Sequence, residues 1–338
     1  MKRLLIATAL TMCAAGAYAS NWRGADQVYI PIAGHAVAGA NTFVSDVQLA
    51  NLTGDTVVVS VIYQPVNVPT NPEVPSTVGQ EFKDIITLQP FERKEYKDFF
   101  VSALNLQSGI GLIILNGCKQ GENCGPDGTD DTANTEHYRA ISAESRIYSY
   151  RSDQTPADGT TGQLFSGIPW YNFVSMLQST AQLDEVFVTG ITHTANSTTG
   201  FRTNFGIINA SQYSSTQIAA TLYRGRFHPD NKIDEELITL TPLENKQTNF
   251  PGLFPDAPFG DNYFVHFEQR TSTPVTTGVP STCDQGCPAF LAYASVLDNK
   301  TGDATTLESQ FMKELSPEAI LVVYPTSGKN PWRRAVRK

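Results

Sequence analysis

Short stretches of alternating apolar and polar residues, separated by turn-forming residues, recur along the whole chain. In TVVVSVIY (56–63), three valines and a tyrosine occupy alternate positions, whereas GLIILNG (111–117) is apolar on both faces. Alternation with a period of two is typical of strands with one buried face, and a fully apolar run is typical of a central strand. Gly, Asn and Asp clusters such as 51–55 punctuate these runs. The pattern predicts short antiparallel strands and an all-β fold.

The strand pattern occurs twice in the chain. VYIPIAGHAVAGANTFVSDVQLANLT (28–53) aligns without a gap with VFVTGITHTANSTTGFRTNFGIINAS (186–211). Two further pairs of blocks follow in the same order: ITLQPFERK (86–94) with ITLTPLENK (238–246), and AISAESRIY (140–148) with AFLAYASVL (289–297). Three matching blocks in one order indicate a duplicated unit, because self-similarity at a fixed spacing is the mark of repeat architectures.

Two tandem antiparallel immunoglobulin-like β-sandwiches, joined by a short helical connector, are the predicted architecture. Short helices are expected at 92–104 and 174–183. The predicted divisions are a signal peptide at 1–19, a first sandwich at 20–151, a connector at 152–184, a second sandwich at 185–314, and a C-terminal strand with a basic tail at 315–338.

The first residues have the composition of an export signal. Lys2 and Arg3 precede a short apolar core at 4–10, and Ala17-Tyr18-Ala19 is a small-x-small cleavage sequence. We therefore expect cleavage after Ala19 and a periplasmic or extracellular protein. A lipid anchor at Cys13 is an alternative, although Met12 departs from the small residue that such signals carry before the cysteine. No later run reaches the roughly 18 apolar residues that a transmembrane helix needs.

The chain is acidic, with a formal net charge of −9 and only 17% charged residues. Nucleic-acid binders carry a basic footprint, so this balance argues against that class. The last ten residues, KNPWRRAVRK, carry five positive charges and are the exception. They are interpreted as a solvated tail, with contact to an anionic surface as the alternative.

Four cysteines remain after the signal, in two local pairs at the same position of each repeat. An even count, export and matched positions predict two loop-closing disulfides. Zinc or redox chemistry would favour closer CxxC spacing. The predicted bridges are Cys118–Cys124 and Cys283–Cys287.

Two acidic loops contain candidate calcium ligands, because calcium is coordinated by clustered oxygen atoms. Neither loop has EF-hand spacing, and turn formation explains the same residue types. The candidates are Asp127, Asp130 and Asp131 in GPDGTDDT, and Asp298, Asn299 and Asp303 in DNKTGD. No other cofactor is expected.

Aromatic and histidine residues supply two further hypotheses. Trp170, Tyr171 and Phe173 would form a stacking platform for a sugar or a protein if exposed, and would attach the connector to a sandwich if buried. His35 and His193 occupy equivalent positions in the repeat, which favours a structural role over catalysis.

Catalytic motifs such as GxSxG, GxGxxG, HExxH or a Walker loop are absent from the sequence. The motifs VYIPIAGHAVAGANTFVSDVQLAN, FRTNFGIINAS, ITLTPLENKQ and AYASVLDNKTGD resemble those of exported bacterial proteins built from tandem immunoglobulin-like sandwiches. This resemblance implies the fold and export, and it transfers no activity. The first unit departs from it where SRIYSYRSDQ stands in place of ASVLDNKTGD.

These observations predict an exported, non-enzymatic binding or structural module. Its partner would be a protein or a cell-envelope glycan, contacted through loop tips or an aromatic patch. One alternative is a carbohydrate-active hydrolase with dispersed carboxylates, since catalytic groups assemble in space and leave no linear motif. Another is a self-assembling surface subunit that associates through an open sheet edge.

Overall fold

The computed structural model describes residues 24–69, 79–122, 137–174, 185–211, 214–274 and 289–311. Of these residues, 64% lie in strands and 7% in helices. All strand pairings are antiparallel apart from one isolated bridge, between Val66 and Asn245. The predicted all-β antiparallel sandwich fold is therefore confirmed. The described helices are all too short to cross a lipid bilayer.

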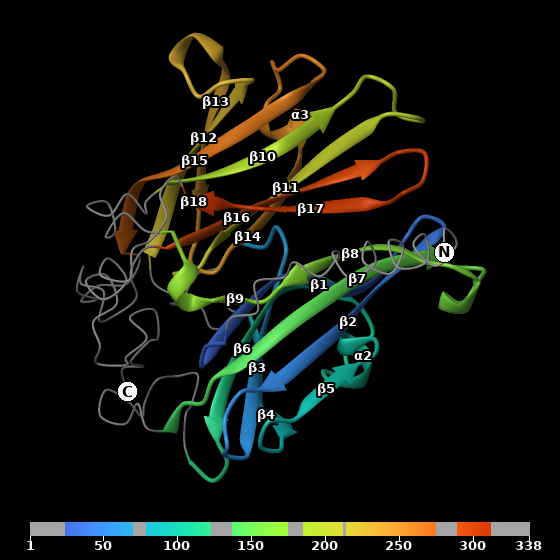
Figure 1. The fold of residues 1–338 in the computed structure, drawn as a ribbon, viewed down its shortest axis with the longest axis vertical. Helices are drawn as coiled ribbons and strands as arrows, with labels where there is room; N and C mark the ends of the chain where they lie inside the picture. The colour runs from blue at the N-terminus through green and yellow to red at the C-terminus, as the bar shows by residue number, and fades with distance from the viewer. Residues whose placement is uncertain are drawn as a thin grey trace, which may run out of the picture.

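Among the described residues, a first unit contains nine strands and one short α-helix (Figure 1). Its elements are β1 (Gln27–Ala38), β2 (Asn41–Asn51), β3 (Val57–Pro65), β4 (Gln80–Leu88), β5 (Arg93–Tyr96), α2 (Phe99–Ser102), β6 (Gly109–Lys119), β7 (Ile141–Arg151), β8 (Thr161–Ser166) and β9 (Ile168–Pro169). One layer has the order β4-β3-β6-β1-β9, and the other has β5-β2-β7-β8. The end of β1 pairs with β2 from His35 to Ala38 and joins the layers.

A second unit repeats this plan element by element. Its elements are β10 (Glu185–His193), β11 (Phe201–Asn209), β12 (Ser214–Arg224), β13 (Lys232–Leu240), β14 (Asn245–Asn249), α3 (Phe250–Leu253), β15 (Gly260–Pro274), β16 (Phe290–Asp298), β17 (Ala304–Glu308) and β18 (Gln310–Phe311). Its sheets have the orders β13-β12-β15-β10-β18 and β14-β11-β16-β17. Each matches a layer of the first unit strand for strand.

The strand correspondence extends past residue 151, where the sequence places the end of the first sandwich. Strands β8 and β9 are counterparts of β17 and β18, so the strands that match between the units run to Pro169. The segment 161–169, TGQLFSGIP, has little apolar alternation because β8 is an edge strand, paired only with β7. Of the predicted helix at 92–104, only Phe99–Ser102 is helical, and β5 occupies its start. The helix predicted at 174–183 lies outside the described residues, apart from Val174.

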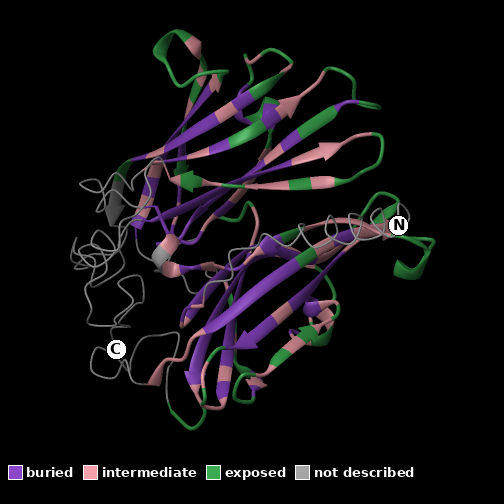
Figure 2. Cartoon of the chain, in the orientation of Figure 1, coloured by how far each residue is buried: buried purple, intermediate pink, exposed green. Residues whose placement is uncertain are grey.

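Buried residues are found along the strands of both units (Figure 2). Three clusters of buried apolar side chains hold the molecule together. One fills each unit, between its two layers. The third joins the units, with Tyr29, Ile62 and Ile114 of the first packed against Leu291 and Tyr293 of the second. Burial of apolar surface is the main favourable term in folding and association. Apolar packing therefore holds the two units together in the same way as it holds the two layers of each sandwich together.

Candidate functional site

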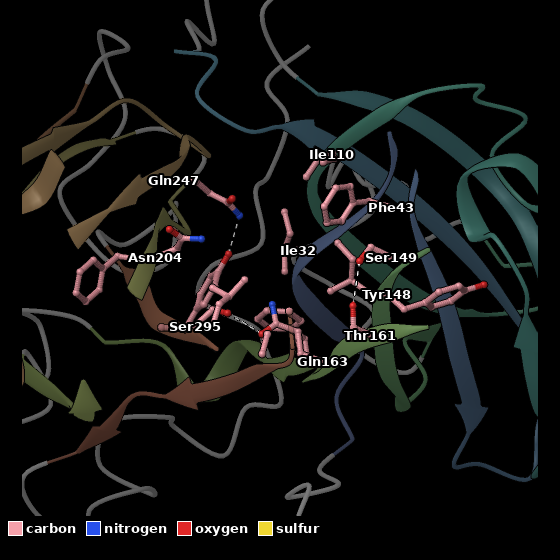
Figure 3. Close-up of a pocket in the computed structure, with 18 residues that line it drawn as sticks. Ile32, Phe43, Ile110, Tyr148, Ser149, Thr161, Gln163, Asn204, Gln247 and Ser295 are labelled. Carbon is pink, nitrogen blue, oxygen red and sulfur yellow. Dashed lines mark hydrogen bonds between the residues drawn. The ribbon is translucent and has the colours of Figure 1, made fainter. Parts of the chain in front are cut away.

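A cavity of about 210 Å³ lies at the junction of the two units (Figure 3). Its walls come from β1, β2, β6, β7 and β8 of the first unit, and from β11, β14, β16 and β17 of the second. Ligand sites are concave and occur preferentially between domains. This cavity is therefore the best candidate for a ligand site in the described part of the chain.

Branched and aromatic side chains of the first unit form the apolar wall of the cavity. Ile32, Phe43, Ile110 and Ile147 line it from four different strands. Ile32 is buried, and the other three are half-buried, so they present apolar surface to the cavity. Such surface suits the apolar face of a ligand.

Hydroxyl and amide groups of both units meet beside this apolar wall. The hydroxyls of Ser149 and Thr161 lie 3.2 Å apart, across the β7–β8 pair. The Ser295 hydroxyl donates to Gln163 Oε1 at 2.7 Å, which links β16 to β8 across the junction. The Gln163 Nε2 group makes no hydrogen bond within the described residues, so it remains available as a donor.

Tyr293 forms the opposite wall from the centre of β16. Its hydroxyl accepts a hydrogen bond of 2.8 Å from Gln247 Nε2, and burial raises the pKa of the phenol. The hydroxyl therefore stays protonated near neutral pH. The neighbouring residue on β11 is Gly206, where a Cβ would overlap the ring of Tyr293. Glycine at this position allows the ring to lie flat on the strand.

Asn204 contributes an amide that no other described residue engages. Its counterpart in the first unit, Asp46, accepts hydrogen bonds from Lys97 Nζ (2.9 Å), the Asp98 backbone N–H (3.0 Å) and the Tyr148 hydroxyl (3.2 Å). Asn204 lines the cavity and makes no side-chain hydrogen bond within the described part of the chain. Its donor and acceptor atoms can therefore serve a ligand.

The described part of the cavity lining is uncharged. None of the described lining residues is Asp, Glu, Lys, Arg or His. Burial and the adjacent Asp46 carboxylate raise the pKa of Tyr148 to about 12, so this phenol is neutral as well. A charged ligand would lose hydration without gaining a counter-charge, which is costly. The site is suited to a neutral ligand with several hydroxyl groups.

Only one of the two predicted calcium loops lies within the described residues. Asp127, Asp130 and Asp131 lie outside the described residues. In the second loop, the Asp298 carboxylate accepts a bond of 2.8 Å from the Lys300 N–H, and Asn299 Oδ1 accepts from Arg202. The Asp298 and Asp303 backbones are joined across the hairpin. Hydrogen bonds of this kind are typical of turns. Among the described residues, no three His, Cys, Asp or Glu side chains are grouped for a metal ion.

Only one of the four cysteines in the predicted disulfides lies within the described residues. Cys118 lies buried at the end of β6. Cys124, Cys283 and Cys287 lie outside the described residues, so both bridges stay predictions.

The predicted aromatic platform of the connector is largely internal. Phe173 is fully buried and meets the Tyr29 ring edge-on, with ring centroids 4.6 Å apart. Trp170 is half-buried, and its indole N–H donates to Asp26 Oδ1 at 2.7 Å. Tyr171 has no described side chain. Phe173 and Trp170 attach the end of the first unit to its neighbours, which is the role expected of these rings if buried.

A different group of aromatic rings lies on the outer face of the second unit. We call the set Phe187, Tyr223, Phe227, Phe264 and His266 the aromatic face. Phe187 contacts Phe227 and Phe264, with ring centroids 5.1 and 5.9 Å apart. Phe227 is 50% exposed. Sequence reasoning missed this set because its members are far apart in the chain; the alternation of Phe264 and His266 along β15 was the available signal.

The two equivalent histidines have non-equivalent surroundings. His35 Nδ1 lies 2.8 Å from Asp98 Oδ2. His193 stacks on Phe250 and Phe259, with ring centroids 4.8 and 5.3 Å apart, and burial lowers its pKa. Each ring fixes the end of its strand against the following short helix or loop.

Comparison with known proteins leaves the family open. No protein-family model and no curated protein matches the chain. Among solved structures, the chain is similar to a β-glucuronidase from Bacteroides uniformis at 9% identity, with a TM-score of 0.13. The match covers 82% of this chain and 25% of that chain, so the chain spans about a quarter of its length. A TM-score this low carries no argument about fold or activity.

Proposed function

We propose that the protein is an exported, non-enzymatic binding module that holds a neutral sugar unit of a cell-envelope glycan in the cavity between its two units. The observation that carries the proposal is the cavity lining, which combines uncharged amides and hydroxyls with an apolar wall. Export rests on the predicted signal at residues 1–19.

Sugars match this lining in two ways. Each hydroxyl of a sugar both donates and accepts, and the amides of Asn204, Gln163 and Gln247 offer both functions. The apolar wall at Ile32 and Ile147 suits the C–H surface of a pyranose ring. The cavity volume of about 210 Å³ is below the roughly 300–1,000 Å³ of sites for drug-sized ligands. A single terminal or branching sugar is therefore the expected occupant.

Hydrolysis is not the chemistry that this cavity supports. Glycoside hydrolysis uses two carboxyl groups that flank the scissile bond. Among the described residues, the lining contains neither Asp nor Glu, so a bound sugar would meet hydrogen-bonding groups there and no general acid. The same lining supports binding without turnover.

Titration calorimetry with neutral mono- and oligosaccharides tests the proposal. The wild-type chain is expected to bind at least one of them. Asn204→Leu places an apolar side chain in the cavity and removes an amide, and we expect it to weaken binding at least tenfold, since about 1.4 kcal/mol corresponds to a factor of ten.

Gln310→Leu is the matched control, because it removes an exposed amide on β18, away from the cavity. It is expected to bind as the wild type does. Failure of every neutral saccharide to bind, or unchanged binding by Asn204→Leu, would refute the assignment of the cavity.

A further inference from the structure

The two units differ at one edge that they share. Strand β13 ends the sheet β13-β12-β15-β10-β18, as β4 ends the corresponding layer of the first unit. Each is paired on one side only, β13 with β12 and β4 with β3. Within the described part of the chain, no strand pairs with the outer edge of either. An open edge is a template for another strand unless it is blunted.

In the first unit, a bulge blunts the edge. The register of β4 on β3 shifts between Val59 and Val61. Asp84 adopts a left-handed backbone there, with φ of 50°. Its N–H donates to Ser60 Oγ at 3.0 Å, and the Ser60 hydroxyl lies 3.0 Å from Asp84 Oδ1. The bulge bends β4 and interrupts the row of outward backbone groups that a second strand would need.

In the second unit, the same edge is regular. The residues from Leu240 to Asp234 on β13 pair with those from Thr216 to Leu222 on β12 without a shift. The register changes only beyond this run, between Leu222 and Tyr223. No residue of β13 has a positive φ. Strand β13 therefore offers a straight edge where β4 does not.

Backbone hydrogen bonds show which groups of β13 point outward. The Glu235 N–H donates to Asp234 Oδ1 at 2.8 Å, so it is directed away from β12. In an antiparallel ladder, the backbone groups of every second residue point to the same side. Leu237 and Thr239 therefore also present their N–H and C=O groups outward. The Leu237 side chain is 56% exposed at the middle of this edge.

The sequence of β13 is complementary to itself around Leu237. Two copies related by a two-fold axis at Leu237 would place it opposite its own copy, and Glu235 opposite Thr239. Centring on Glu235 or Glu236 would place a carboxylate opposite itself, which is destabilising. Moving the centre towards the end of the strand shortens the overlap. The Glu235 carboxylate is also partly neutralised by Lys232 Nζ at 2.7 Å.

We propose that two copies of the chain associate edge to edge through β13, antiparallel and centred on Leu237. The contact is isologous, because each copy uses the same strand, and it closes at a dimer. It joins two five-stranded sheets into one continuous sheet. The β13 residues do not line the cavity, so the dimer stands independently of sugar binding.

One charge opposes this contact and supplies a test of its register. With Leu237 at the centre, Glu236 of one copy lies diagonal to Glu236 of the other, within reach of a long side chain. Salt screens such a repulsion, so we expect the dimer to tighten as ionic strength rises. Glu236→Gln removes the repulsion and is expected to tighten the dimer at low salt.

Sedimentation velocity of the full chain over a range of concentrations tests the proposal. The weight-average mass is expected to rise to twice the monomer mass and no further. Leu237→Asp places two carboxylates opposite each other and is expected to leave the chain monomeric. Ile85→Asp is the matched control: Ile85 precedes ITL (86–88) as Leu237 precedes ITL (238–240), and it is 39% exposed on the blunted edge. This variant is expected to dimerise like the wild type.

Thr239→Pro tests the backbone contact separately from the side chains. Proline removes one outward N–H and is tolerated on an edge strand where that N–H faces solvent. We expect a folded monomer, with the circular dichroism spectrum of the wild type. A wild-type chain that stays monomeric, or whose mass grows past the dimer, overturns the proposal. So does a dimer that survives Leu237→Asp or that Ile85→Asp weakens equally.

Discussion

The two units share every strand and differ in how the same internal positions are stabilised. In the first unit, Asp46 lies 5% exposed beneath Lys97, and Asp98 caps α2 in a left-handed conformation with φ of 47°. Asp46 accepts the Asp98 N–H, and Asp98 contacts His35. A charged network therefore stabilises a strained cap, which a non-glycine residue adopts at a cost.

In the second unit, aromatic packing replaces this network. Asn204 occupies the position equivalent to Asp46, and His193 stacks on both Phe250 and Phe259. The cap residue of α3 is Asn249 with an extended backbone, and its Oδ1 accepts from Gly252. Without the strained cap, no buried carboxylate is needed, and the Asn204 amide becomes available to line the cavity.

This difference separates the positions that must be apolar in both units from the positions at which the fold tolerates different polar residues. Both units keep the alternating apolar residues between their layers, such as Val47 and Phe205. The polar positions occupied by Asp46 and Asn204 have diverged, because the cost of a polar residue there depends on its local partners and not on strand pairing. New chemistry at the junction arose at these tolerant positions.

The largest expected effect distinguishes Tyr29, which is buried in the junction, from its counterpart Phe187. Tyr29→Ala removes a fully buried ring, and we expect it to lower the free energy of unfolding by about 3–5 kcal/mol. Phe187→Ala, at the equivalent half-buried position, is expected to cost about 1 kcal/mol. Urea denaturation followed by tryptophan fluorescence measures both. Equal losses would contradict the unequal burial of the two rings.

A smaller effect separates the charged network from its replacement. Asp46→Ala leaves the Asp98 N–H and the Tyr148 hydroxyl without their acceptor, and is expected to cost about 2 kcal/mol. Asn204→Ala removes no hydrogen bond to the described residues and is expected to change stability by less than about 0.5 kcal/mol. Thermal unfolding of the pair, compared with wild type, provides the readout. A larger loss for Asn204→Ala would reverse the comparison.

The smallest effect is a pH dependence confined to the second unit. Burial lowers the pKa of His193 below its ordinary value of 6.5, so the unfolded chain takes up a proton more readily than the folded one. Its contribution to stability is full above about pH 6.5 and is lost as pH falls towards the lower folded-state pKa. His193→Phe keeps the ring stack and is expected to flatten the stability profile below pH 6.5. An unchanged slope in denaturant midpoints would remove His193 from that role.

The candidate site was beyond the reach of sequence patterns for a physical reason. The cavity gathers Ile32, Asn204 and Gln247 with Gln163, which lies in the segment predicted as the connector. Their proximity depends on how one sandwich packs on the other, and periodicity within a strand carries no information about that packing. Turn residues such as Asp298 were easier to find in sequence, and the structure shows them forming turns.

By itself, the sequence determined the strands, the duplication and the antiparallel sandwich class, because alternating apolar residues such as those of 57–63 must be buried on one side of a sheet. Only the tertiary structure decided which copy of the outer face is covered. Tyr29 and Phe187 occupy the same register and are both aromatic, yet one is fully buried in the junction and the other is only half-buried. Burial between units depends on contacts between residues distant in the chain, which local pattern does not encode.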